Sequence, residues 1–265
     1  MIERIYILNN KRIEETEKEK EKLIDFLKKE GKTVQQDIDE NTDLLITLGG
    51  DGTLLKGFHL VKIDRTLIFG VKFGKIGFMT NKVSDIKESL KDIFDGNFVL
   101  SERMVIGGKV VSDGKVLYDD FSLNEIVIFR KGIRIIGIRG LFDGDEFLKI
   151  RADGIIISTP TGSTAHNLSS GGPILFPEIE AIVVSLVCPY TLSSRSIVLP
   201  ADRKIYFEID GEGEIIFDGQ RKFDINSNCI VEISKSERKA RLVFTENVKF
   251  FERLRERFGF FKNFV

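Results

Sequence analysis

The sequence predicts an α/β domain followed by an all-β domain, and three observations lead to this prediction. Apolar runs alternate with helical patterns up to about residue 97, whereas from residue 103 onward short apolar runs are separated by polar turns. The hydrophobic content, 42% of 265 residues, is ample for a packed core. Strands interleaved with helices are typical of a parallel sheet covered by helices. Many short strands separated by turns are typical of a β-sandwich or a similar layered sheet.

The first domain is predicted to span residues 1–98 and to be a Rossmann-like parallel α/β domain. Its expected elements, in chain order, are a strand over 4–8, a helix over 13–30, a strand near 32–35, a strand over 44–48, a helix over 53–59, a strand over 66–71 and a helix over 84–94. The first helix begins with a charged run, which precedes Leu23, Phe26 and Leu27 at helical spacing. We therefore assign that run to the solvated face of the helix.

The second domain is predicted to span residues 99–246 and to be β-sandwich-like. Its expected strands cover 105–111, 121–129, 133–142, 155–157, 182–186, 205–209, 215–217, 230–233 and 241–244. Asp113-Gly114, between two apolar runs, is interpreted as a simple hairpin turn. Cys188 and Cys229 lie in strand-like surroundings and are expected to be buried thiols. A final helix over about 247–265 places its phenylalanines on one face and is predicted to dock on the first domain, although an oligomer contact is an alternative.

The first candidate site is the motif Gly49-Gly50-Asp51-Gly52-Thr53, which directly follows an all-apolar run. Glycines allow tight turns and the close approach of a ligand to the backbone. The helix that follows would point backbone N–H groups out of the strand end, which suits an anion. A carboxylate in such a pocket repels polyphosphate, so its presence calls for a chemical reason. One such reason is to accept a proton from an attacking hydroxyl. The motif therefore predicts phosphoryl transfer.

Two observations qualify this interpretation. Asp-Gly is also a common hairpin turn, and Lys56, one helical turn beyond Thr53, is as consistent with a solvated lysine as with a phosphate contact. Neither G-x4-G-K-[ST] nor G-x-G-x-x-G occurs, so the two commonest nucleotide loops are excluded.

The second candidate site is residues 151–173, where hydroxyl side chains and glycines surround one strand end. Residues 155–157 are expected to form a buried strand, followed by a turn at Pro160-Thr161-Gly162. Ser163 or Thr164 is expected to cap a short helix whose free N–H groups face a ligand. A solvated loop is the alternative, which the preceding apolar strand argues against.

With Asn124-Glu125 inside the segment Phe-Ser-Leu-Asn-Glu-Ile, these motifs resemble those of NAD kinases of the compact prokaryotic kind. The resemblance spans residues 44–220, approximately. The first motif is shared with diacylglycerol and sphingosine kinases, and phosphofructokinases carry a close variant of it. The segment from Asp153 to Pro173 distinguishes NAD kinases from both groups. The other two functions considered are a lipid (diacylglycerol-type) kinase and a non-catalytic dinucleotide-binding regulator.

The resemblance implies transfer of the γ-phosphoryl of ATP to the 2′-hydroxyl of the adenosine ribose of NAD, giving NADP and ADP, in a cleft between the two domains. Asp51 matches the catalytic acid that takes the hydroxyl proton. The NAD-binding residues that it implies are Asp51, Gly52, Phe78, Asn124, Glu125, Arg134, Arg151, Asp153, Thr161, Thr164, Ala165, His166, Asn167, Ser169 and Gln220. The phosphate donor is assigned to Gly49, Gly50, Gly52, Thr53 and Lys56.

Three positions need comment. Lys131 is the alternative to Arg134 for a basic contact. His166 stands where many relatives have a tyrosine that stacks on the dinucleotide, and histidine can also stack and donate a hydrogen bond. Ser196 stands where relatives often have proline, which we interpret as a local loop change.

Composition sets further expectations. The 40 basic and 41 acidic residues nearly cancel, so nothing favours a nucleic-acid or membrane surface. No apolar stretch reaches membrane-spanning length and the N-terminus lacks the pattern of a signal peptide, so a cytoplasmic protein is expected. Few acidic residues look like metal ligands, so Mg²⁺ or another divalent cation is expected to arrive on ATP rather than at a site in the protein. The family commonly forms homodimers or homotetramers, and the same is expected here.

Overall fold

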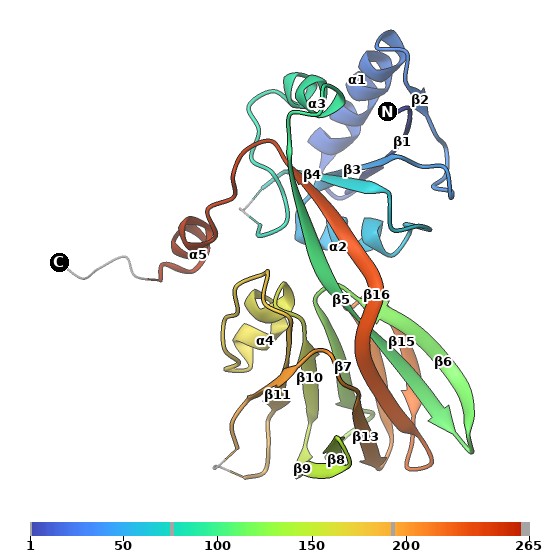
Figure 1. Ribbon diagram of the computed structural model, residues 1–265, viewed down its shortest axis with the longest axis vertical. Coiled ribbons are helices and arrows are strands. Elements are labelled where there is room, and N and C mark those ends of the chain that lie inside the picture. Colours follow the sequence, from blue (N-terminus) through green and yellow to red (C-terminus); the bar gives the residue numbers. More distant parts are fainter. Residues whose placement is uncertain (1, 75–76, 192–193, 261–265) are drawn as a thin grey trace, which may run out of the picture. The chain divides into compact units, whose positions relative to one another are not determined.

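The structure, a computed structural model, describes residues 2–74, 77–191 and 194–260 (Figure 1). The chain divides into two compact units. Unit 1 comprises Met1–Glu102 and Ala240–Val265, and unit 2 comprises Arg103–Lys239. Two long strands, β5 (Val99–Ser112) and β16 (Ile230–Phe244), contain the points at which the chain passes from one unit to the other.

Unit 1 contains a parallel sheet in the order β2-β1-β3-β4, with the end of β16 beside β4. The strands are β1 (Arg4–Asn9), β2 (Thr33–Val34), β3 (Leu44–Gly49) and β4 (Leu67–Lys72). The helices are α1 (Glu14–Lys29), α2 (Asp51–Phe58), α3 (Ile86–Phe94) and α5 (Phe250–Phe258). Every residue of β3 is buried, as expected of a parallel strand covered on both faces.

The core of unit 1 joins this sheet to its helices. Ile5 and Ile7 of β1 pack in one apolar cluster with Leu23 and Leu27 of α1, and Leu90 of α3 belongs to it too. The charged run of α1 lies mostly on the exposed side of the helix, as predicted. The predicted order of strands and helices over the first 94 residues is confirmed.

Unit 2 contains two layers of antiparallel strands. One is a six-stranded sheet in the order β12-β11-β10-β7-β14-β15. The other contains β16, β13, β8 and β9, with β5 and β6 paired beside β16. The bounds are β6 (Lys115–Ser122), β7 (Glu125–Arg130), β8 (Ile136–Phe142), β9 (Asp145–Ala152), β10 (Gly154–Ser158), β11 (Ala181–Val187), β12 (Ile197–Pro200), β13 (Ile205–Asp210), β14 (Gly213–Phe217) and β15 (Arg221–Ile225). Two short helices, η1 (Gly162–Thr164) and α4 (His166–Ser169), follow β10.

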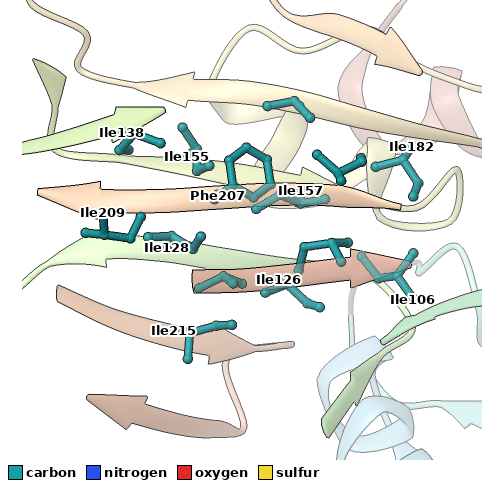
Figure 2. Close-up of a cluster of buried hydrophobic side chains, with 14 of the residues drawn as sticks. Ile106, Ile126, Ile128, Ile138, Ile155, Ile157, Ile182, Phe207, Ile209 and Ile215 are labelled. Carbon is teal, nitrogen blue, oxygen red and sulfur yellow. The ribbon is translucent and has the colours of Figure 1, made fainter. Parts of the chain in front are cut away.

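The apolar faces of these two sheets share one core (Figure 2). Ile126 and Ile155, from the six-stranded sheet, lie in the same buried cluster as Ile138 and Phe207, from the other sheet. Two sheets packed face to face in this way form a layered β structure. The predicted fold class, a parallel α/β domain plus a β-sandwich-like domain, is confirmed.

Several predicted elements differ from the structure. The strand predicted over 121–129 is two strands, because the backbone N–H groups of residues 123–125 donate to the Asp218 side chain. The strands predicted over 230–233 and 241–244 are one, β16, because backbone pairing continues through the polar residues between them. Strands β9 and β15 were not predicted, since the charged residues within them weaken the apolar signal. Strand β12 was not predicted either, because it is apolar but only four residues long.

Two local predictions had opposite outcomes. Asp113-Gly114 is a hairpin turn between β5 and β6, with positive φ at both residues, as predicted. The prediction that both cysteines are buried is wrong for one of them. Cys229 is buried, but Cys188 is exposed because it follows the last residue of β11 and turns the chain with a φ of 45°.

Candidate active site

In unit 1 the glycine-rich motif joins β3 to α2. Gly50 is extended and forms the N-cap of α2, which begins at Asp51. The first N–H groups of an α-helix have no partner within the helix, so they are available to an anion. A Cβ atom built on Gly50 or Gly52 would meet nothing within 4 Å, whereas one on Gly49 would lie 2.2 Å from Thr53 Oγ1. The outer surface of the motif is therefore open, and its inner side is closely packed.

The Asp51 carboxylate is held by a second segment, residues 77–80. The Phe78 N–H donates to Oδ2 at 2.8 Å and the Met79 N–H donates to Oδ1 at 3.2 Å. Thr80 Oγ1 lies 3.4 Å from Oδ1. A Cβ on Gly77 would lie 2.0 Å from Oδ1, so only glycine allows the carboxylate to come this close. Asp51 remains half-exposed, so the carboxylate is fixed in direction and still accessible.

Three other residues predicted for this site lie nearby in unit 1. Phe78 is half-buried, and its ring packs on Phe258 at a centroid distance of 5.7 Å. Thr53 is half-buried on the first turn of α2, and Lys56 is exposed on the same helix.

In unit 2 the central feature is Asp218, which the sequence analysis did not select. Its carboxylate accepts the N–H groups of Leu123 at 2.8 Å, Asn124 at 2.8 Å and Glu125 at 3.1 Å. Asp218 is only 4% exposed and stands at the turn between β14 and β15, with a φ of 49°. This arrangement fixes the backbone of the Asn124-Glu125 pair at the start of β7 and aligns both side chains.

Three buried polar atoms next to this turn have unsatisfied hydrogen-bonding capacity. Within the described part of the chain, no partner is found for Asn124 Oδ1, Glu125 Oε2 or Thr161 Oγ1. The segment carrying Thr161 is tied to Asn124, because the Thr159 N–H donates to the Asn124 carbonyl at 2.8 Å. A Cβ on Gly162 would lie 2.1 Å from that same carbonyl oxygen. Unpaired buried polar groups are costly, so such a cluster is typical of a site that a polar ligand completes.

Glu125 is the most perturbed acid of the site. Burial raises its pKa to about 8, and the negative charge of Asp218 acts in the same direction. A hydrogen bond from the His166 backbone N–H opposes the increase. The Glu125 side chain is therefore largely protonated at neutral pH and can donate a hydrogen bond as well as accept one.

The segment after β10 is held by hydrogen bonds within the chain. Asn167 is fully buried, and its Nδ2 donates to the carbonyls of Ser163 and Pro173 while its Oδ1 accepts from the Ser185 hydroxyl. Ser185 also contacts the hydroxyl of Ser196 at 2.8 Å. Ser196 thus extends the polar network around Asn167.

The predicted helix cap in this segment is wrong. No side-chain cap hydrogen bond is made at the start of η1 or α4. The Ser163 hydroxyl instead donates to the Pro160 carbonyl and accepts the Leu175 N–H, so it closes the loop. The Thr164 hydroxyl is directed to the Thr161 carbonyl at 3.4 Å.

The basic residues of unit 2 near the site, predicted and not, lie in different places. Arg130, which was not selected from the sequence, pairs with Asp153 through Nε at 2.5 Å. Lys131 pairs with Asp224, and Arg134 is exposed. Arg151 is exposed on β9 and lines a cavity of about 810 Å³ together with residues of β8 and β13.

The remaining predicted residues lie near the surface of unit 2. Ala165 is half-buried, and the side chains of His166, Ser169 and Gln220 are exposed. Gln220 follows the turn that carries Asp218, and its Nε2 donates to the Asp218 main-chain carbonyl at 3.4 Å.

Two kinds of feature are absent from the described residues. Among them, no cluster of three or more His, Cys, Asp or Glu side chains that could hold a metal ion is found. No helix in the same part of the chain is both long and apolar enough to cross a membrane.

Sequence comparisons identify the family. Residues 4–98 match the description "ATP-NAD kinase N-terminal domain" and residues 123–245 match "ATP-NAD kinase C-terminal domain". The chain is 37% identical over 226 residues to a protein named NAD kinase from Thermoanaerobacter sp., covering 83% of this chain and 80% of the relative. It is 33% identical over 263 residues to a protein named NAD kinase from Lachnoclostridium phytofermentans, covering 89% of this chain and 92% of the relative.

Solved structures agree with the sequence comparisons. An NAD kinase from Archaeoglobus fulgidus, solved in complex with ATP, has a TM-score of 0.77 and 26% identity, covering 97% of each chain. Yeast NADH kinase, solved with NADH, has a TM-score of 0.90 over 100% of this chain and 89% of its own, and at 20% identity it shows the fold alone. The chain therefore belongs to the ATP-NAD kinase family, as its two matched domains, its motifs and its relatives show.

Proposed function

We propose that Asp51 is the general base of the NAD kinase reaction. In this proposal its carboxylate accepts the proton of the 2′-hydroxyl of the adenosine ribose of NAD as that oxygen attacks the γ-phosphorus of ATP. The new bond joins the ribose oxygen to phosphorus, the bond from phosphorus to the bridging oxygen of ADP breaks, and the products are NADP and ADP. NAD kinase activity itself follows from membership of the family.

One observation carries this proposal: the Asp51 carboxylate is fixed by hydrogen bonds yet half-exposed. Its two oxygens together provide about four acceptor positions, and the 77–80 segment uses at most three of them. A position therefore remains for a substrate hydroxyl. A general base in this arrangement contributes about 10² to 10⁴ in rate.

We further propose that unit 2 provides the polar contacts to NAD. The unpaired atoms of Asn124, Glu125 and Thr161 support this assignment, because a dinucleotide offers both donors and acceptors. Glu125 in its neutral form adds no charge that would repel the pyrophosphate. Asn167 uses its amide within the chain, so in this proposal it shapes the loop around the dinucleotide rather than touching it.

The exposed side of the glycine-rich motif is proposed to bind the phosphates of ATP, with Thr53 and Lys56 on the following helix. Backbone N–H groups at the start of α2 support this, since they favour negative charge. The divalent cation belongs to the nucleotide substrate in this proposal and needs no ligand set in the protein. A homodimer or homotetramer, a cytoplasmic location and a site between the two domains stay predictions from the sequence.

Asp51→Asn tests the assignment directly. The amide keeps the shape of the side chain but cannot take up the proton, so NADP formation at saturating NAD and ATP should fall by about 10² to 10⁴ while NAD still binds. Isothermal titration with NAD measures binding, and Asp92→Asn, an exposed aspartate of α3, is the matched control. Near-normal turnover in the Asp51 variant would remove Asp51 from this role.

A further inference from the structure

Helix α5, near the C-terminus, contacts the segment that holds Asp51. Phe258 stacks on the Phe78 ring, and Phe250 lies 6.1 Å from the same ring, measured between centroids. The Arg257 guanidinium lies 5.9 Å from the Phe78 ring centroid. Leu254, on the buried side of α5, is 2% exposed. The helix is therefore part of the packing of unit 1 around residues 77–78.

Arg253 makes the most specific of these contacts. Its Nη1 donates to the carbonyl oxygen of Gly77 at 3.0 Å, and its guanidinium lies 5.4 Å from the centroid of the buried Phe244 ring. Burial lowers the pKa of Arg253, and the charge of Asp51 acts in the opposite direction. The charge of Arg253 therefore lies within electrostatic range of the carboxylate.

The Gly77 carbonyl and the Phe78 N–H belong to one peptide group. The carbonyl accepts from Arg253, and the N–H donates to Asp51 Oδ2 at 2.8 Å. Because a peptide group is planar, fixing its C=O also fixes the direction of its N–H. A cationic donor on the carbonyl further polarises the N–H and strengthens its hydrogen bond. Rotation of this peptide would break both contacts together.

We propose that Arg253 is a positioning residue that orients the Asp51 carboxylate through the Gly77–Phe78 peptide. The inference rests on the proposed role of Asp51 as the base. A small displacement of a reacting group lowers the rate of the chemical step more than it weakens substrate binding. In this proposal helix α5 contributes to catalysis by carrying Arg253, although the helix lies outside both matched domain ranges.

The test compares Arg253→Met and Arg253→Lys with Arg255→Met, which removes the same charge from the same helix. Arg253→Met should lower kcat by about 10- to 100-fold, with the KM values for NAD and ATP changed by no more than about threefold. Arg253→Lys keeps a cationic donor and should recover most of that loss. Arg255→Met should stay close to the unmodified protein. An equal kcat in the Arg253→Met and Arg255→Met variants would overturn the proposal.

A double variant separates this inference from the proposed function. If Arg253 acts through Asp51, adding Arg253→Met to Asp51→Asn should change kcat little further. An undiminished effect of Arg253→Met in that background would refute the coupling, even though Asp51 kept its role. Near-normal activity of Asp51→Asn alone would instead refute the proposed function. Melting temperatures are measured for all variants. If Arg253→Met is unfolded at the assay temperature, Arg253→Gln takes its place, because its neutral amide is a weaker donor than a cation, and a kcat equal to that of Arg255→Met would then overturn the proposal.

Discussion

Two aspartates of this chain have similar hydrogen-bond environments and different consequences. Asp51, in unit 1, accepts two backbone N–H groups and faces the Thr80 hydroxyl, and Asp218, in unit 2, accepts three backbone N–H groups. Asp51 is half-exposed at the start of a helix, whereas Asp218 is 4% exposed in a turn between strands. A carboxylate held by several donors is therefore not by itself a catalytic group. Accessibility decides whether it can exchange a proton with a substrate.

The two sites also differ in what remains unsatisfied. In unit 1 the acceptor capacity left over belongs to the carboxylate itself, which suits proton transfer. In unit 2 the carboxylate is buried, and the unpaired atoms belong to Asn124, Glu125 and Thr161, which suits binding. In the proposed function, the buried aspartate therefore organises a binding surface and the accessible aspartate takes part in the chemistry.

The largest expected effect comes from removing each carboxylate in turn. Asp218→Ala leaves three buried N–H groups without an acceptor, at about 1–3 kcal/mol each before relaxation, so the free energy of unfolding should fall by about 3–5 kcal/mol. Asp51→Ala should lower it by about 1 kcal/mol, because water can reach the freed N–H groups. Urea unfolding followed by circular dichroism measures both. Equal losses in the two variants would contradict the proposed difference in role.

The next effect concerns Glu125, whose pKa is raised by burial and by Asp218. Its pKa is about 8 in the folded protein against an ordinary value of 4.5, so between these pH values the folded chain holds a proton that the unfolded chain has lost. The stability contribution is therefore complete below pH 4.5 and falls as the pH rises toward 8. Over the three pH units from 5 to 8, at about 1.4 kcal/mol for each unit, the loss is on the order of 4 kcal/mol.

Glu125→Gln cannot titrate, so this part of the pH dependence of stability should disappear. Urea unfolding at several pH values from 5 to 8 measures the slope, and Glu237→Gln, an exposed glutamate of unit 2, is the matched control that should keep it. An unchanged slope in the Glu125 variant would show that this carboxyl group does not titrate in that range. The deprotonated form at high pH should also bind NAD less tightly, because it adds a negative charge to the site proposed for a negatively charged dinucleotide.

Much of the fold could be predicted from the sequence because its signals are local. The apolar run of β3 and the alternation of strands with helices in the first 94 residues depend on neighbouring residues alone. The same is true of the Asp113-Gly114 turn. Polar strands such as β15 could not be predicted, since they are stabilised by pairing with distant strands rather than by their own composition.

The site was predictable to the extent that its residues lie in glycine-rich or hydroxyl-rich motifs. Asp218 was not selected because its partners lie 93 to 95 residues earlier in the chain, and an Asp-Gly dipeptide usually indicates only a turn. Arg130 was not selected because its partner Asp153 is 23 residues away on another strand. The contact of Arg253 with Gly77 spans 176 residues. Such long-range pairs give no pattern in one sequence.

The smallest effect, and the most specific to unit 1, is expected for Gly77→Ala. The added Cβ would lie 2.0 Å from Asp51 Oδ1 and 2.7 Å from Thr80 Oγ1, so the carboxylate must move. A displaced base should lower kcat by about tenfold, equivalent to about 1.4 kcal/mol. The KM for NAD should change little if unit 2 supplies most of the binding.

The matched control is Gly107→Ala on β5, where a Cβ would meet only atoms at 3.9 Å. Steady-state kinetics of NADP formation in both variants measure the difference. A tenfold rise in the KM for NAD with an unchanged kcat in Gly77→Ala would mean that the 77–80 segment binds the dinucleotide rather than orienting the base. That result would reverse the comparison between the two units, because binding would then depend on unit 1 and the accessible carboxylate would lose its distinct role.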